Sequence, residues 1–172
     1  MSMAIVAIDL ILSAMTKSDD SCPIACGLAR VGDSWSMLIL RDASLGVTRF
    51  DQFRKNLGIA PTILTRRLQE LTADGLLEKR RYSTHPPRDE YLLTPAGRDF
   101  LPVLVALGTW ARRHYGHGEL SRLVDAETGQ ALDPVVVDRV SGTEVGSRPL
   151  RLEPASVDAG GAQMPAEAPA RP

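Results

Sequence analysis

The chain has few cysteines, no long hydrophobic run and almost no net charge, and each shortage excludes a class of protein. Its 172 residues include two cysteines, which are too few for a disulfide scaffold and fit a reducing compartment. No apolar run reaches the roughly 18 residues that a membrane-spanning helix needs. The apolar opening stretch contains Asp9 and lacks a preceding basic residue, so it makes a poor signal peptide. We therefore expect a cytoplasmic protein with one compact core.

The sequence also lacks the residue patterns of catalytic and metal sites. It has no nucleophile–base set, phosphate-binding loop or paired-carboxylate motif. Its three histidines, His85, His114 and His117, have neither ligand spacing nor neighbouring thiols. We expect no enzyme activity, no cofactor and no metal.

The net charge of -1 conceals an uneven distribution along the chain. Between Arg41 and Arg98, 11 Lys and Arg residues stand against 7 Asp and Glu. From His117 to Pro172 the counts are 5 and 9. A basic middle beside an acidic end favours a nucleic-acid partner for the middle, although solvated faces alone give the same pattern.

Composition divides the chain into four regions. Residues 1–21 form an N-terminal arm, residues 22–115 are dense in helix signals, and residues 116–154 resemble short strands. The Ala- and Pro-rich residues 155–172 are expected to be disordered.

Helix boundaries in the second region follow from capping residues. Pro23 after Cys22 opens a first helix, and Asp33 is placed to cap a second. The sequence Thr48–Asp51 resembles a capping box and begins a third.

The third helix stops at Gly58, and after a three-residue turn Pro61 opens a fourth that runs to Gly75. Two helices joined by a tight turn that contains glycine are typical of the helix-turn-helix.

Two strands and a last helix follow. Strands are expected over Leu76–Tyr82 and Arg88–Thr94, separated by the helix-breaking segment Ser83–Pro87. Thr94-Pro95 caps a long helix that ends near His114. The predicted fold class is α+β but mainly α: a winged helix-turn-helix with a two-stranded wing, a long dimerisation helix and a small β-rich C-terminal extension.

The fourth helix has two contrasting faces when its residues are placed about 100° apart. Leu64, Leu68 and Leu71 share one stripe, with Arg67 at its edge. The opposite face carries two hydroxyls, a guanidinium and an amide, from Thr62, Thr65, Arg66 and Gln69. Such groups can contact phosphates and base edges in a major groove, although any amphipathic helix has a polar face.

The hairpin that follows is rich in cations: Lys79, Arg80, Arg81, His85 and Arg88. These side chains could hold the phosphate backbone or enter a minor groove. Alternatively the hairpin is a solvated turn whose cations pair with Glu78, Asp89 and Glu90.

Three segments of the chain together resemble the HxlR-type winged helix regulators of bacteria. They are CPIACGLARVGDSW, LILRDASLGVTRFDQFRKNLGIAPTILTRRLQELTADGLLEKRRY and HPPRDEYLLTPAGRDFLPVLVALGTWARRH. The resemblance covers about residues 22–114. Ala60 departs from it, since serine is common there. The resemblance implies a homodimer that binds a palindromic operator as a repressor or activator. The candidate DNA-binding residues are Arg49, Ala60, Pro61, Thr62, Thr65, Arg66, Gln69, Arg80, His85 and Arg88.

The last predicted helix is apolar on nearly all sides over residues 100–111, so a partner subunit is expected to cover it. The candidate dimer residues are Phe100, Leu101, Leu104, Leu107 and Trp110. The resemblance implies that the first helix contributes as well.

Family members often sense a small molecule or an oxidant, and Cys22 matches the position of a sensing cysteine in some of them. A thiol at a helix N-terminus experiences the positive end of the dipole, which favours the thiolate. Alternatively Cys22 is an ordinary capping residue and Cys26 a small core residue.

The C-terminal extension contains two similar segments, Asp125–Gly129 and Asp138–Gly142, which suit hairpin turns with glycine in a left-handed conformation. A small antiparallel sheet is expected from residues 120–125, 132–138 and 145–152. The extension could cover an effector pocket, extend the dimer contact or be inert packing.

A winged helix can also bind protein, so a protein–protein interaction module without specific DNA binding is the alternative function. Salt-sensitive binding to duplex DNA would separate the two possibilities.

Overall fold

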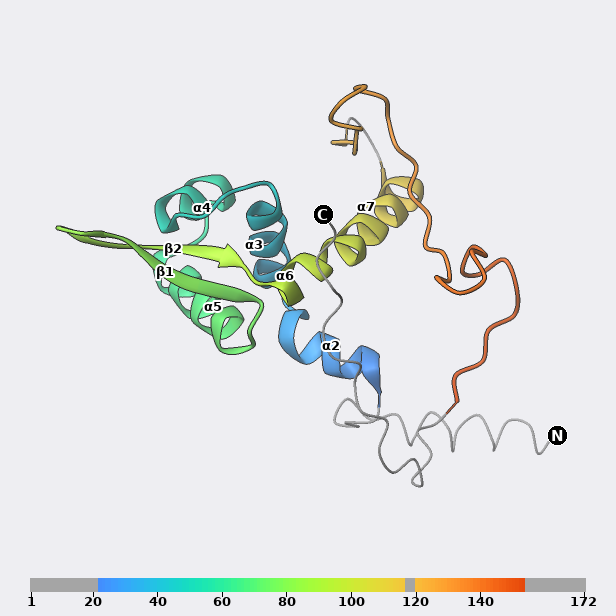
Figure 1. Cartoon of the computed structure of the whole chain (residues 1–172), viewed down its shortest axis with the longest axis horizontal. Helices are drawn as coiled ribbons and strands as arrows, with labels where there is room; N and C mark the ends of the chain where they lie inside the picture. The colour runs from blue at the N-terminus through green and yellow to red at the C-terminus, as the bar shows by residue number, and fades with distance from the viewer. Residues whose placement is uncertain (1–21, 117–119, 154–172) are drawn as a thin grey trace, which may run out of the picture.

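The computed structural model describes residues 22–116 and 120–153, and the expected arm and tail lie outside them. Four helices come first: α2 (Pro23–Val31), α3 (Ser34–Ser44), α4 (Phe50–Leu57) and α5 (Pro61–Ala73). A hairpin of β1 (Leu77–Thr84) and β2 (Pro87–Leu93) follows, and α6 (Pro95–Asp99) and α7 (Leu101–Tyr115) complete the order (Figure 1). The described part of the chain is thus mainly helical with one two-stranded sheet, as predicted.

The core lies between α3, α4, α5 and the start of the hairpin. Nine hydrophobic residues are buried there: Val31, Ile39, Leu40, Phe53, Ile59, Leu64, Leu68, Leu71 and Leu77. Burial of this set, most of which lies on α3, α4 and α5, fixes the two helices of the helix-turn-helix against α3. The face of α5 opposite its leucines is left outside.

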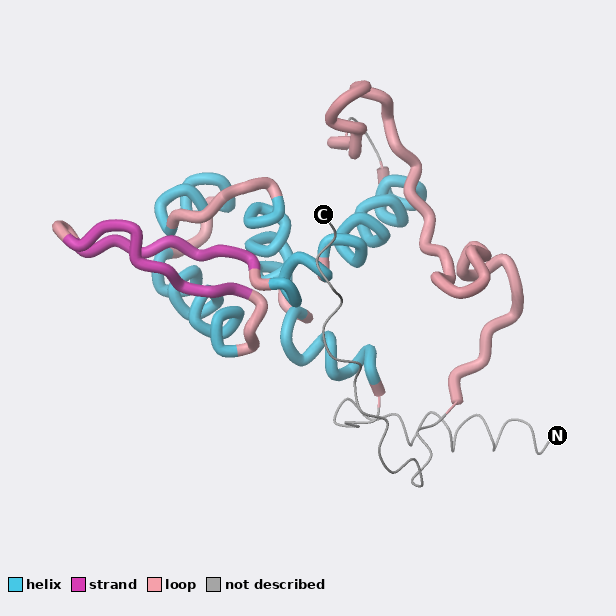
Figure 2. The backbone as a smooth tube through the Cα atoms, in the orientation of Figure 1, coloured by secondary structure: helices cyan, strands magenta, loops and turns pink. Residues whose placement is uncertain are grey.

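The wing is an antiparallel pair whose register runs from Leu77 opposite Leu93 to Thr84 opposite Pro87, with an irregularity between Arg81 and Ser83. Its strands run further toward the tip than predicted. A bridge between Arg49 and Glu90 joins the residues before α4 to β2. Figure 2 shows that the hairpin extends well beyond the helices.

Two helix boundaries differ from the sequence prediction. The expected capping box at Thr48 is wrong by one residue: Arg49 is the N-cap of α4, and its backbone N–H donates to Gln52. The expected last helix is two helices, because the backbone of Phe100 ends α6 and begins α7. Phe100 packs against the core, so the break turns α7 away from the body (Figure 1).

The predicted glycine turns of the extension are confirmed. Gly129 and Gly142 have φ angles of 69° and 66°. A hydrogen bond from the backbone N–H of Thr128 lowers the pKa of Asp125. In both turns the aspartate accepts from backbone N–H groups two and three residues ahead, Asp125 from Glu127 and Thr128 and Asp138 from Val140 and Ser141.

The predicted three-stranded sheet of the extension is wrong. Within residues 120–153 each turn is closed by a single isolated bridge, Val124 to Ala131 and Val137 to Glu144. Nearly all residues of this segment are exposed, so no buried face exists to drive pairing of longer strands.

Candidate nucleic-acid interface

The structure separates the two faces of α5 as the sequence predicted. Leu64, Leu68 and Leu71 are completely buried. The residues of the opposite face, Thr62, Thr65, Arg66 and Gln69, are all exposed. This face is presented to solvent next to the wing, since α5 packs against β1. Its hydroxyl, guanidinium and amide groups can therefore contact a duplex directly.

The turn between α4 and α5 leaves the N-terminus of α5 open. Gly58 adopts a left-handed conformation with φ of 61°, and buried Ile59 fixes the turn to the core. Ala60 is the N-cap, and no side chain caps the first turn. Exposed Ala60 and Pro61 thus lie beside free backbone N–H groups at the positive end of a helix dipole, which suits a phosphate.

Arg67 anchors α5 to α3. Its Nε lies 3.1 Å from Oδ1 of Asp33, and its Nη1 donates to Glu70 at 2.7 Å. The Nε contact is an ion pair without hydrogen-bond geometry. Arg67 therefore orients the helix, and Arg66, which is 3.7 Å from Glu70, remains the guanidinium on the exposed face.

Asp33 holds the N-terminus of α3, as predicted, by accepting from the backbone N–H groups of Trp35 and Ser36. Burial raises the pKa of Asp33, but the hydrogen bonds from Ser36 and the charge of Arg67 together outweigh it and lower that pKa overall. The carboxylate is thus stabilised in its charged form.

Three cations of the wing are paired within the hairpin. Arg80 donates to Glu90 at 2.8 Å, and Lys79 and Arg81 lie 2.9 Å and 3.0 Å from Asp89. Hydrogen bonds from Lys79 and then Arg81 lower the pKa of Asp89. These pairs favour the solvated-turn interpretation for Lys79, Arg80 and Arg81.

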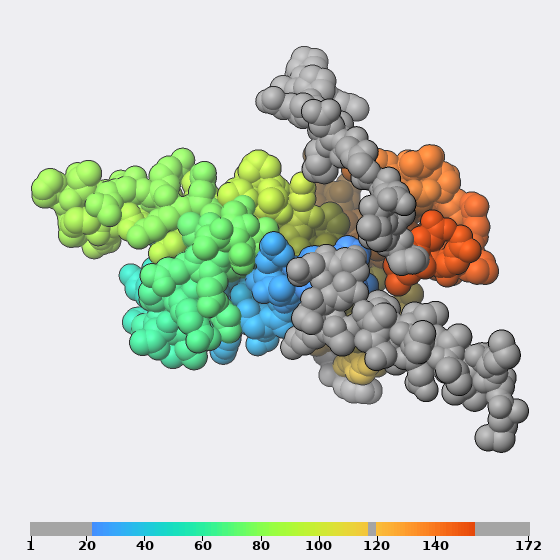
Figure 3. All heavy atoms as spheres, turned by 90° about the horizontal axis from the view of Figure 1, so that it is seen from below, coloured from blue at the N-terminus to red at the C-terminus, as the bar shows by residue number. Residues whose placement is uncertain are grey.

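The tip of the wing retains its cationic character. Arg88 is exposed and has no hydrogen bond or ion pair within the described chain. His85 contacts only the hydroxyl of Thr84, at 3.3 Å, among the described residues. Figure 3 shows the wing projecting past the helical body, so both side chains can reach a surface that α5 also contacts.

Arg49 lies between the wing and α4. Its guanidinium carbon is 4.6 Å from the centre of the Tyr82 ring, which is a cation–π distance. Arg49 is therefore held against the hairpin between its middle, where it bridges Glu90, and Tyr82 nearer the tip.

Sequence reasoning missed two cations on α4. Arg54 and Lys55 are exposed in its last turn and have no charged partner among residues 22–116 and 120–153. Their position around buried Phe53 is the signal that could have found them, because the first helix of a helix-turn-helix crosses the phosphate backbone.

Cys22 is the N-cap of α2, as predicted, and its side chain caps nothing. Both it and Cys26 are half-buried, and neither is in a disulfide within the described residues. In the described part of the chain no three His, Cys, Asp or Glu side chains come together as a metal site.

The predicted dimer residues fall into two groups. Phe100 and Leu104 pack against the core of their own chain. Leu101, Leu107 and Trp110 are exposed, Leu107 by 42% and Trp110 by 51%. Ile24 and Leu28, one turn apart on α2, are exposed apolar residues as well.

Among the described residues, none of the helices combines the length and the apolar character that a membrane span requires.

Comparison with known proteins gives a consistent result. The profile of the HxlR-like helix-turn-helix family matches residues 30–119. An uncharacterized HTH-type transcriptional regulator of Mycobacterium tuberculosis is 38% identical over 129 residues, which cover 74% of this chain and 82% of the relative.

Two solved structures place the fold among regulators. The crystal structure of PA1607, solved as a candidate transcription factor, is 36% identical with a TM-score of 0.71, covering 78% of this chain and 96% of PA1607. The redox regulator HypR in its reduced form is 31% identical with a TM-score of 0.51, covering 54% of this chain and 95% of HypR. These relatives support DNA-binding transcriptional regulation, and the family is not one of enzymes. The chain belongs to the HxlR-like helix-turn-helix family.

Proposed function

We propose that the chain is a homodimeric transcriptional regulator that binds a palindromic operator. The observation that carries the proposal is the exposed polar face of α5 beside the unpaired cations of the wing tip. Thr62, Thr65, Arg66 and Gln69 enter the major groove, where Arg66 and Gln69 contact base edges. Ala60 and Pro61 place the open N-terminus of α5 against a phosphate.

Cations outside α5 hold the DNA backbone. Arg88 and His85 lie at the tip of the wing, and Arg54 and Lys55 lie in the last turn of α4. Arg49 contributes from beside the middle of the wing, and Arg80 contributes only by exchanging Glu90 for a phosphate. This exchange makes Arg80 a weaker contact than Arg88.

The two subunits associate through α2 and α7. Leu101, Leu107 and Trp110 of α7 and Ile24 and Leu28 of α2 supply apolar surface that the described chain leaves uncovered. Two recognition helices one duplex turn apart, about 34 Å, then match the two halves of a palindrome.

Control by a small molecule or by oxidation of Cys22 completes the proposal. Cys22 stands at the N-terminus of α2, which is one of the proposed dimer helices. The similar fold of HypR, a redox regulator, supports this control. As a regulator of transcription the protein acts in the cytoplasm, where bacterial DNA lies.

A protein-binding module is the second candidate, and one observation favours it. Lys79, Arg80 and Arg81 are already neutralised by Asp89 and Glu90, which lowers the charge that the wing offers to phosphates.

Binding to DNA from upstream of the protein's own gene, measured over a salt series with and without a mild oxidant, tests the proposal. Tight, dimeric binding that weakens steeply with salt is the expected result. Loss on oxidation, restored by thiol and absent in Cys22→Ser, would establish the redox control. No preference over random duplex at low salt would favour the protein-binding module.

A further inference from the structure

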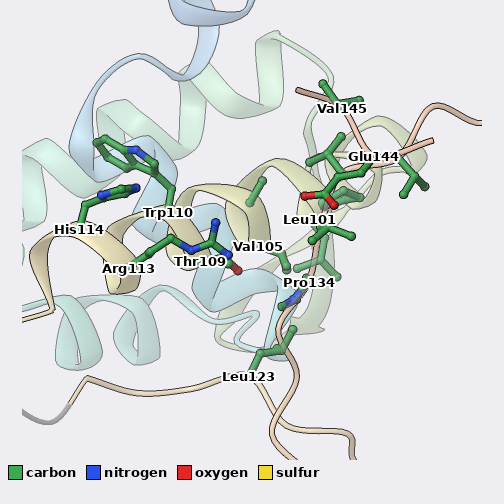
Figure 4. A pocket seen from close by; sticks show the side chains of 15 residues that line it. Leu101, Val105, Thr109, Trp110, Arg113, His114, Leu123, Pro134, Glu144 and Val145 are labelled. Carbon is green, nitrogen blue, oxygen red and sulfur yellow. The ribbon is translucent and has the colours of Figure 1, made fainter. Parts of the chain in front are cut away.

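The C-terminal extension and α7 form the two walls of an open cavity of about 810 Å³ (Figure 4). The α7 wall repeats every fourth residue, through Leu101, Val105, Thr109 and Arg113. The opposite wall is the extended stretch 134–137 together with Glu144 and Val145. The cavity is therefore formed by the segment that distinguishes this chain from a minimal winged helix.

The described chain leaves this cavity unfilled. Val135, Val136 and Val137 line it and are each 52–53% exposed. Three consecutive half-exposed valines opposite Val105 form apolar walls around open space. Such walls gain free energy when an apolar group displaces the water between them.

Part of the α7 wall of the cavity lies on a different face from Leu107, one of the proposed dimer residues. At about 100° per residue, Val105 and Thr109 point away from Leu107 by roughly 160°. Leu107 is not among the lining residues, whereas Leu101 and Trp110 belong to both surfaces. A partner subunit on the Leu107 face therefore leaves the Val105 and Thr109 side of the cavity open.

The extension is shared with some solved neighbours and not with others. Residues 22–116 are little more than half of the chain, so a match to PA1607 over 78% of it must reach into the extension. HypR matches 54% of this chain over nearly its whole length. Part of the extension therefore has a structural counterpart in PA1607.

Polar groups at the two ends of the cavity define the chemistry of its occupant. Arg113 and His114 stand in the last turn of α7 near Thr109, whereas Glu144 lies near Leu101 at the other end (Figure 4). The only ion pair of Arg113 within the described residues is a long one, 3.8 Å to exposed Asp133. An acid with one carboxylate can replace Asp133 at Arg113, while Glu144 disfavours a second negative charge.

We propose that this cavity binds an apolar monocarboxylate, an aromatic or medium-chain acid, with its carboxylate at Arg113 and its apolar body between α7 and the valines. The cavity volume falls within the range of about 300–1,000 Å³ typical of small-molecule sites. Occupation joins the extension to α7. The regulatory consequence, a change in the packing of the dimer helix, rests on the proposed function.

Calorimetric titration of the full chain with 2-naphthoate tests the binding. Its cationic and neutral analogues, 2-naphthylmethylammonium and 2-naphthalenemethanol, serve as comparisons. We expect naphthoate to bind most tightly, and Arg113→Gln to weaken it about five- to tenfold while leaving the alcohol unchanged. Arg139→Gln, the matched control on an exposed turn outside the cavity, should change neither.

Val136→Asp should remove binding of both naphthoate and the alcohol, with an unchanged far-UV spectrum. Equal binding of the three probes, or naphthoate binding that Arg113→Gln leaves intact, would overturn the proposal. Absence of naphthoate binding to a folded dimer would also overturn it. Operator binding without ligand is measured separately, so its failure would contradict the proposed function and leave the cavity result standing.

Discussion

The cations of the wing differ in whether a carboxylate already neutralises them. Arg88 has no partner in the described chain, whereas Arg81 is 3.0 Å from Asp89. Arg88→Gln should therefore reduce the slope of log affinity against log salt concentration by about one for operator binding. It should also weaken binding to all DNA sequences by the same factor. Arg81→Gln, the matched control, should change the slope less, because Arg81 must first give up Asp89. Equal slopes for the two variants would show that the wing tip does not contact phosphate.

Substitution of the exposed polar residues of α5 should reduce the preference of the protein for its operator over other DNA. Arg66→Ala or Gln69→Ala should cost about 1–3 kcal/mol at the operator and much less on random duplex. Both side chains are exposed on the face opposite the buried leucines, so folding should be unaffected. Competition binding with operator and random DNA measures the difference. A uniform loss on all sequences would assign these residues to the phosphate backbone.

Asp33 joins two helices through one carboxylate. Because it caps α3 and pairs with Arg67, Asp33→Ala should lower the free energy of unfolding by about 1–2 kcal/mol near neutral pH. The folded-state pKa of Asp33 is lowered from 3.8, so this stability is present above that value and is lost as pH falls through the folded pKa.

Urea unfolding at neutral and at strongly acidic pH measures both effects. The difference in free energy of unfolding between Asp33→Ala and the unchanged chain should be smaller in acid. Asp74→Ala, which removes an exposed carboxylate at the other end of a helix, is the control and should show little change at either pH. A difference in free energy of unfolding that does not change with pH would mean that the charge of the carboxylate does not contribute to stability.

At the scale of the element, the close approach of α6 to the start of the wing depends on Gly97. A Cβ there would lie 2.1 Å from the carbonyl oxygen of Leu76, which is backbone and cannot turn aside. Gly97→Ala should therefore destabilise the fold by about 1–3 kcal/mol in thermal unfolding.

Gly108→Ala is the matched control, because a Cβ at that position in α7 meets nothing within 4 Å of the described chain. The control should be neutral or stabilise the fold by about 1 kcal/mol, since alanine favours a helix over glycine. Equal effects of the two substitutions would contradict the close packing of α6.

The helices could be predicted from the sequence because their signals are local. The leucine spacing of α5, Asp33 as a cap and Gly58 as a turn residue each act within a few positions along the chain. The break at Phe100 could not be predicted, because it depends on that side chain packing into a distant core. The prediction of a sheet in the extension was wrong for a related reason. Turn residues specify a turn, but strands need a buried face to pair over their length.

The exposed face of α5 could be predicted from the sequence, but the ion pairs of the wing could not. The polar side of α5 follows from periodicity alone. The pairing of Arg80 with Glu90 depends on the strand register, which places the two residues opposite each other across the hairpin. The sequence offered both partners and no means to decide between pairing and phosphate contact.

At the scale of the whole molecule, α7 presents the surface that a second copy would cover. All fifteen residues of α7 retain some exposure, since the core of one chain covers only one side of the helix. Ile24 and Leu28 of α2 add a second uncovered apolar surface. Covering Leu107 and Trp110 in an interface would contribute roughly 1–3 kcal/mol for each side chain.

Leu107→Asp should therefore yield a monomer without lowering the melting temperature of the single chain, because Leu107 is 42% exposed there. Sedimentation would show the halved mass, and operator affinity should fall more than tenfold while the affinity for an isolated half-site is retained. Val140→Asp, at a residue of the extension that is 95% exposed, is the control and should remain dimeric. If Leu107→Asp sedimented as a dimer of undiminished affinity, the subunits would have to meet elsewhere. The exposed apolar face of α7 would then need a different partner, because water alone does not favour Leu107 and Trp110 on one surface.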